Sequence, residues 1–123
     1  MQTLRMSAKL LGAFLEALKA WGTVWAPVGK GEGVYSLEVM DDVDAVRPDA
    51  LRTQLPFKKL LLKPKFTMLE RDAQGHVTDP RDNDAGPQVF FGAHACDVHA
   101  LKILDLLYLS DYVDPYYQRN REQ

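Results

Sequence analysis

Segment 87–109 constrains the fold most, because its hydrophobic pattern changes from that of a strand to that of a helix. Residues 87–91 are aromatic and β-branched and follow a glycine, which is typical of a short buried strand. Gly92 ends this strand. From Asp97 to about Leu109, apolar residues recur every three or four positions, and Asp97 can accept the backbone N–H groups of the first helical turn. The segment predicts a strand, a sharp turn and a helix.

The N-terminal half contains a second helical pattern and a hairpin pattern. Residues 7–21 predict an amphipathic helix with Ser7 as its N-cap and Gly22 as its stop. The β-prone runs 23–26 and 33–39 flank a turn-rich stretch and predict a hairpin. We therefore expect an α+β (or small α/β) fold, with a short central sheet, this N-terminal helix and a helix after the Val89–Phe91 strand.

Length, charge and cysteine content limit the class of protein. The 123 residues suit one domain over 1–123, and the formal net charge of -2 gives no general attraction for nucleic acid. The N-terminal apolar region is interrupted by charges and falls short of the ~20 apolar residues of a membrane span. We expect a cytoplasmic, soluble protein without nucleic-acid binding or membrane insertion. A single cysteine excludes an internal disulfide.

The turn of segment 87–109 carries the candidate reactive residue. Cys96 is expected just before the helix N-terminus, where the helix dipole favours a thiolate that can act as nucleophile or metal ligand. The alternative is a small buried cysteine that only packs the turn, which is the commonest fate of a lone cysteine. His94 and His99 flank the turn, but the pair spacing of zinc ligands is missing.

A basic cluster and two further elements complete the pattern. The cluster surrounds three leucines and comprises Lys58, Lys59, Lys63 and Lys65. Such a mixture is typical of long side chains that extend along a helix or strand edge, and the alternative is docking onto an acidic partner. Residues 66–70 predict a strand, followed by an exposed polar loop over 71–87. Asp114 and Pro115 predict the start of a C-terminal helix held to the domain by Tyr116 and Tyr117.

Three blocks of the sequence, in this order, resemble one known family. Residues 57–69 (FKKLLLKPKFTML) are similar to its pattern K-x-x-L-F-P-x-x-E-x-L. Residues 89–105 (VFFGAHACDVHALKILD) are similar to F-G-V-R-P-C-D-x-x-A-L-x-x-L-D, and residues 114–122 (DPYYQRNRE) to D-x-Y-Y-x-x-R-R-E. The chain thus resembles the N-terminal domain of the ferredoxin-type electron-transfer subunits of anaerobic sulfite reductase and of sulfhydrogenase, where this component is the nickel-iron hydrogenase beta subunit.

This resemblance implies an accessory domain of a four-iron four-sulfur (4Fe-4S) electron-transfer subunit, which assembles and docks with the other subunits of an oxidoreductase complex. It implies a cofactor site at Cys96, Asp97 and His94, in which Cys96 ligates a cluster together with downstream cysteines that this chain lacks. The family's C-terminal ferredoxin domain is absent as well. We therefore expect no cluster, no catalytic residue and no redox activity in this chain alone.

The chain also departs from the family pattern. His94 and Ala95 stand where the family has Arg-Pro, so a fixed bidentate charge is lost. Two other functions remain as alternatives. One is a small enzyme with Cys96 as nucleophile and His94 as base, although no third group is evident to orient that base. The other is a purely structural interaction domain that docks through the lysine cluster.

Overall fold

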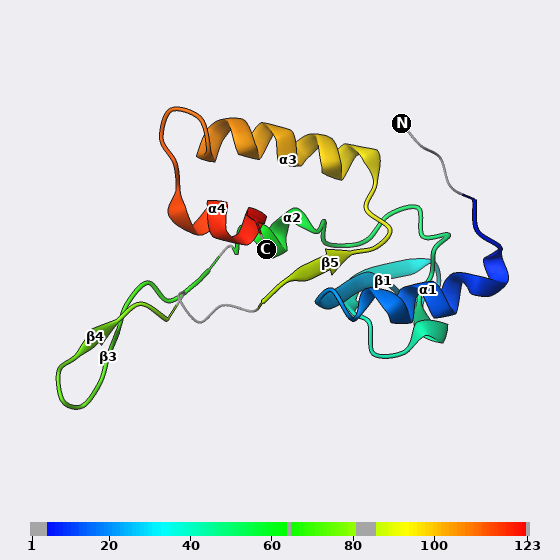
Figure 1. Ribbon diagram of the computed structural model, residues 1–123, viewed down its shortest axis with the longest axis horizontal. Coiled ribbons are helices and arrows are strands. Elements are labelled where there is room, and N and C mark those ends of the chain that lie inside the picture. Colours follow the sequence, from blue (N-terminus) through cyan, green and yellow to red (C-terminus); the bar gives the residue numbers. More distant parts are fainter. Residues whose placement is uncertain (1–4, 64, 81–85, 123) are drawn as a thin grey trace. The chain divides into compact units, whose positions relative to one another are not determined.

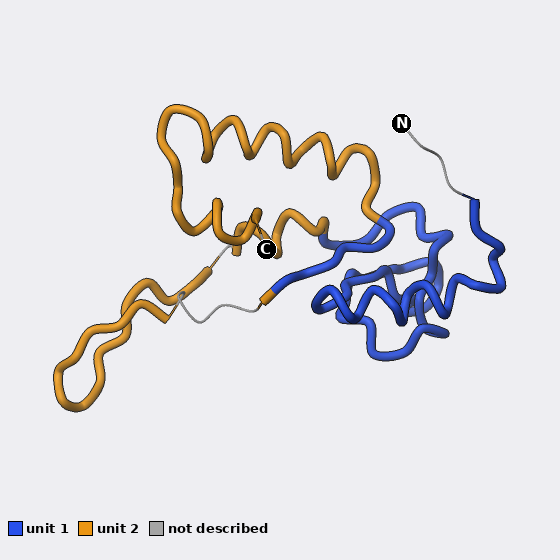
Figure 2. The backbone as a smooth tube through the Cα atoms, viewed as in Figure 1, with its two compact units in different colours: residues 1–55, 87–92 blue, residues 56–86, 93–123 orange. Residues whose placement is uncertain are grey.

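The computed structural model describes residues 5–63, 65–80 and 86–122, which form two compact units (Figure 2). Unit 1 comprises residues 1–55 and 87–92, and unit 2 comprises residues 56–86 and 93–123. The helices and two small sheets (Figure 1) confirm the predicted α+β fold. One accessory domain over residues 1–123 stays a prediction.

Unit 1 contains a short helix and a three-stranded sheet. Its elements are η1 (Ala8–Leu10), α1 (Leu11–Leu18), β1 (Thr23–Gly31), β2 (Val34–Val39), η2 (Val43–Ala45) and β5 (Gln88–Phe90). The strand order is β2-β1-β5, with β2 antiparallel and β5 parallel to the central β1. The predicted hairpin and the predicted strand near Val89 are both confirmed. Since β5 is an edge strand with one neighbour, its residues are half-buried instead of buried.

The core of unit 1 lies between α1 and the sheet. Leu15 is fully buried and packs with Val24 and Ala26 of β1, together with Met40 and Val46. Burying one leucine side chain contributes about 1.5–3 kcal/mol, so the apolar stripe of α1 is a main source of stability in this unit.

The N-terminal helix is shorter than predicted. A 3-10 turn precedes α1, and the chain leaves helical geometry after Leu18, where the N–H of Trp21 donates to the Leu18 carbonyl. That bond spans three residues and tightens the end of the helix. Trp21, the last residue of the predicted amphipathic helix, is consequently 74% exposed.

Unit 2 contains three helices and a two-stranded hairpin. Its elements are α2 (Lys58–Leu61), β3 (Glu70–Arg71), β4 (Val77–Thr78), α3 (Ala95–Tyr108) and α4 (Pro115–Glu122). Helix α2 packs against both α3 and α4. The largest fully buried side chain of this unit is that of Tyr117 on α4, which is 1% exposed.

The strand predicted over residues 66–70 is wrong except at its last residue. Only Glu70 and Arg71 pair with another strand, β4, whereas 66–69 have no ladder partner within the described residues. A strand needs a hydrogen-bonded neighbour, which the local pattern does not supply. In the predicted polar loop, β4 is exposed and residues 81–85 lie outside the described residues.

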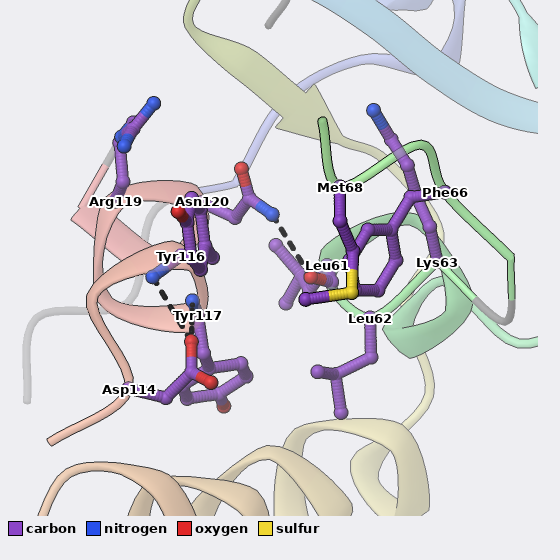
Figure 3. Close-up of a pocket in the computed structure, with 10 residues that line it drawn as sticks. All are labelled: Leu61, Leu62, Lys63, Phe66, Met68, Asp114, Tyr116, Tyr117, Arg119 and Asn120. Atoms are coloured by element: carbon purple, nitrogen blue, oxygen red, sulfur yellow. Dashed lines mark hydrogen bonds between the residues drawn. The ribbon is translucent and has the colours of Figure 1, made fainter. Parts of the chain in front are cut away.

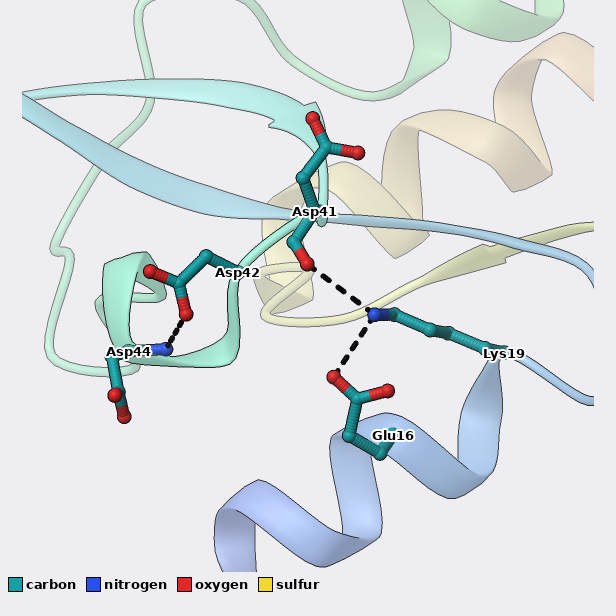
Figure 4. A network of polar contacts seen from close by, with 5 residues as sticks. All are labelled: Glu16, Lys19, Asp41, Asp42 and Asp44. Carbon is teal, nitrogen blue, oxygen red and sulfur yellow. Dashed lines mark hydrogen bonds and ion pairs between the residues drawn. The ribbon is translucent and has the colours of Figure 1, made fainter.

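Polar contacts join the end of α1 to the segment after β2. The Lys19 Nζ atom lies 2.9 Å from Glu16 Oε1 and 3.4 Å from the Asp41 carbonyl oxygen (Figure 4). Asp42 Oδ1 accepts the N–H of Asp44 at 2.9 Å and starts the short helix η2. These exposed contacts close the acidic turn onto α1.

No helix within residues 5–63, 65–80 and 86–122 combines the length and the apolar character that crossing a bilayer requires.

Candidate functional site

The start of α3 differs from the prediction. The carbonyl oxygen of His94 accepts the N–H groups of Asp97 and Val98, at 3.0 and 3.1 Å. His94 is extended, with φ -81° and ψ 157°, so it is the N-cap and the helix begins at Ala95. Asp97 is therefore not the cap and lies in the first turn, where its carboxylate still faces the positive end of the helix.

Cys96 lies one position inside the first turn of α3 and is exposed. The expected position just before the helix is wrong, and so is the alternative of a buried cysteine that packs the turn. Gly92, with φ 78°, turns the chain two residues before His94, whose carbonyl oxygen accepts the first helical hydrogen bonds. The thiol is accessible at a helix N-terminus, an environment that favours thiolate chemistry.

The geometry does not bring Cys96 and His94 together as a catalytic pair. His94 is the extended N-cap of α3, whereas Cys96 lies in the first turn of that helix. Within the described residues, no hydrogen bond joins the side chains of His94 and Cys96. His99 is exposed and, three positions after Cys96, shares its face of the helix.

The residues of this chain do not by themselves fit an iron-sulfur cluster. A 4Fe-4S cluster is generally held by four thiolates, and the sequence contains one cysteine. Among residues 5–63, 65–80 and 86–122, no group of three or more His, Cys, Asp or Glu side chains could hold a metal ion. Cys96 can thus supply one ligand at most.

The lysine cluster lies on α2 and the segment after it. Lys58 is half-buried, whereas Lys59, Lys63 and Lys65 are exposed. Of the three leucines between these lysines, Leu61 is buried and lies on the apolar face of α2. The cluster therefore follows the expected arrangement, in which basic side chains surround a short apolar helix face.

Helix α4 begins as predicted at Asp114 and Pro115. Asp114 Oδ1 accepts the N–H groups of Tyr116 and Tyr117 at 2.9 and 2.8 Å, which caps the helix. The Tyr116 hydroxyl donates to Asp79 Oδ2. Both tyrosines thus connect α4 to other parts of unit 2.

The carboxylate of Asp105 on α3 contacts two side chains of α4. The Tyr117 hydroxyl donates to Asp105 Oδ1 at 2.7 Å, and Arg121 contacts the same carboxylate through Nε at 3.1 Å and Nη2 at 3.4 Å. Partial burial acts to raise the pKa of Asp105, but the Tyr117 hydrogen bond and the Arg121 charge hold it below its usual value. Burial has the largest effect on the pKa of Tyr117 and the Asp105 carboxylate the next largest; both raise this pKa well above its usual value.

A pocket of about 340 Å³ in unit 2 was not predicted from the sequence. It lies between α4 and the chain that follows α2 (Figure 3). Phe66 and Met68 contribute to one wall, and Tyr116 and Arg119 to the other. The sequence signal that could have indicated this pocket is the alternation of the apolar residues Phe66 and Met68. The same alternation, however, predicts a strand.

Comparison with known proteins finds a relative of nearly the whole chain. The chain is 37% identical over 122 residues, 99% of its length, to sulfhydrogenase 2 subunit beta of Pyrococcus furiosus. This chain is similar to the N-terminal part of a hydrogenase beta subunit. The match takes in 35% of the relative, its N-terminal part, so the chain spans about a third of that protein's length.

The similarity to this hydrogenase beta subunit extends over nearly the whole chain. The match takes in the turn at Cys96, the lysine cluster and helix α4. No protein family model matches the chain, and no solved structure matches it significantly.

Proposed function

We propose that this chain is the accessory N-terminal region of an electron-transfer subunit in an oxidoreductase complex of the hydrogenase type. The observation that carries the proposal is the 37% identity over 99% of the chain to a sulfhydrogenase beta subunit. The three sequence blocks in the order typical of this family support it. In this role the chain assembles with and docks to the other subunits, and it has no redox activity of its own.

The cofactor in this proposal is a 4Fe-4S cluster in the longer parent protein. Cys96 supplies one thiolate, with His94 and Asp97 beside it, and cysteines from outside this chain supply the other ligands. The exposure of Cys96 and its position in the first turn of α3 support this role, because a ligand must be accessible and ionised.

The docking surface in this proposal is the lysine cluster of Lys58, Lys59, Lys63 and Lys65. Three of its four lysines are exposed and suit an acidic surface on another subunit. Attraction between such charged surfaces weakens as salt screens the charges. The experiment measures association of the parent protein with its complex in rising salt. Replacing all four lysines by glutamine should weaken association and flatten its salt dependence.

A matched control comes from the same unit. Lys102 is an exposed lysine of α3 outside the cluster, and Lys102→Gln should leave association unchanged. Equal binding by the four-lysine variant and the parent at low salt would reject docking through this cluster. Absence of iron and inorganic sulfide from the anaerobically purified parent protein would reject the electron-transfer role itself.

A further inference from the structure

One side of helix α3 is apolar although it is not packed within unit 2. Ile103 is 50% exposed, Leu106 69% and Leu107 65%. Leu106 and Leu107 lie three and four positions after Ile103, so the three side chains share one side of the helix, here called the α3 stripe. The buried residue of this helix, Leu101, lies on the other side. Neighbouring exposed apolar residues, unlike single scattered ones, mark an interaction surface.

A groove between α2 and α3 continues the α3 stripe. The two helices contact each other in unit 2 (Figure 1), and the groove between them has a volume of about 310 Å³. Its lining residues are Leu62, Ala100, Ile103 and Leu104, together with Lys58 and Lys59. Ile103 belongs to both the α3 stripe and the groove, so the two form one continuous surface.

Two lysines give this surface a positive rim. Lys59 is exposed and Lys58 is half-buried. Neither side chain forms an ion pair or a hydrogen bond with another residue of the ranges 5–63, 65–80 and 86–122. An ammonium group without a carboxylate partner in its own chain can pair with a carboxylate of another molecule. The rim therefore favours an acidic partner.

The groove and the stripe supply what the lysines alone lack. Pairs between exposed charges contribute little affinity, whereas stable interfaces have an apolar core surrounded by a polar rim. An apolar groove between two helices is also a typical binding site for the apolar face of an amphipathic helix. Acidic residues beside that face would lie opposite Lys58 and Lys59.

We propose that the α3 stripe and the groove between α2 and α3 bind an amphipathic helix of another subunit of the complex, with its acidic residues facing Lys58 and Lys59. The site rests on the proposed function, because it assigns the apolar core of the same docking surface. Cys96 lies on the same side of α3, seven positions before Ile103 and ~10 Å along the helix axis. The docked helix is thereby placed beside the proposed cluster ligand.

Glutamine substitutions in the parent protein test the apolar core. Ile103→Gln and Leu107→Gln keep a good helix former but replace apolar surface by polar surface. Each should weaken association with the other subunits by about three- to tenfold, since part of the burial of one apolar side chain is lost. The loss should be similar at low and high salt, because salt screens charge pairs and not apolar contacts.

Val98→Gln is the matched control. Val98 is 48% exposed on the same helix, but it lies nine positions before Leu107 and therefore on the opposite side. Its substitution should leave association unchanged. Lys59→Gln should weaken association at low salt only. Urea unfolding midpoints equal to that of the unsubstituted protein show that the variants remain folded.

A photo-crosslinking amino acid at Ile103 identifies the occupant in the assembled complex. We expect a crosslink to a helix of another subunit, and no such crosslink from position 98. A crosslink from Ile103 only to the parent's own chain or to a second copy of it would overturn the site, as would unchanged association of both Ile103→Gln and Leu107→Gln. The proposed function would stand in those cases if the parent still bound the other subunits and contained iron. A parent protein that neither associates nor contains iron would reject both.

Discussion

The hydroxyl of Tyr117 donates a hydrogen bond of 2.7 Å to Asp105 and so joins the C-terminal helix α4 to helix α3. The Tyr117 ring also lies 5.2 Å from the ring of Tyr108, measured between centroids. Because Tyr117 is almost completely buried, this contact combines apolar packing with a charge-assisted hydrogen bond. It is one of the contacts that hold α4 in unit 2, beside the hydrogen bond of Tyr116 to Asp79.

Removing only the Tyr117 hydroxyl tests this connection. Tyr117→Phe should lower the free energy of unfolding by about 1–2 kcal/mol, because the half-buried carboxylate loses a donor while Arg121 remains. Urea denaturation measures the change. Tyr112→Phe is the control, since Tyr112 is 83% exposed, and it should leave stability unchanged. Equal stability of Tyr117→Phe and the parent would show that the bond contributes nothing.

The lowered pKa of Asp105 predicts a dependence on acid pH. A carboxyl whose pKa is lower in the folded state stabilises the protein above its unfolded pKa, about 4, and loses this effect as pH falls through the folded value. The stability difference between the parent and Asp105→Asn should be constant above about pH 5 and shrink at lower pH. Unfolding curves from pH 2 to 7 test this, and a difference independent of pH contradicts it.

The N-cap of α4 gives a third prediction. Asp114→Ala removes the acceptor for two backbone N–H groups and should cost about 1 kcal/mol of stability, with loss of helical circular dichroism. Asp114→Ser should restore most of the loss. The exposed Asp111, replaced by alanine, serves as the control and should have no effect. A cap role is rejected if Asp114→Ala and Asp111→Ala behave alike.

Gly22 allows a close approach between two strands of unit 1. Its φ is 153°, and a β-carbon added there would lie 2.0 Å from the carbonyl oxygen of Pro87. That oxygen accepts the N–H of Thr23, at the start of the pairing between β1 and β5. Gly22→Ala should therefore destabilise the protein by about 2 kcal/mol or more.

Gly86 supplies the control for this substitution. A β-carbon at Gly86 meets no atom within 4 Å, so Gly86→Ala should leave the unfolding midpoint in urea unchanged. Full stability of Gly22→Ala would mean that β1 and β5 do not approach as described.

Features determined by local chemistry could be predicted from the sequence. The pair Asp114-Pro115 fixes the start of α4, because the side chain and the proline ring both suit the first helical turn. The hairpin of β1 and β2 was likewise evident in its β-prone runs and glycine-rich turn. The buried face predicted for the N-terminal helix is confirmed at Leu15. It is wrong at Trp21, because α1 ends at Leu18, before the apolar pattern ends.

Features determined by distant contacts could not be predicted. One local feature was missed as well: Asp97 has the better capping side chain, yet the His94 carbonyl accepts the first helical hydrogen bonds and α3 begins at Ala95. Residues 66–69 have a strand-like pattern but no partner strand in the described chain. The unit 2 pocket has Phe66 in one wall and Arg119 in the other. These residues are far apart in the sequence, and only the folded unit brings them to the same pocket.

The central claim is that Cys96 is one ligand of a cluster completed from outside this chain. Its most direct test is electron paramagnetic resonance of the anaerobically purified, reduced parent protein, compared with its Cys96→Ser variant and with iron content as a second readout. We expect the variant to lose one 4Fe-4S signal and about four irons per protein molecule, while the other clusters remain. A variant that keeps every cluster signal and its full iron content would contradict it.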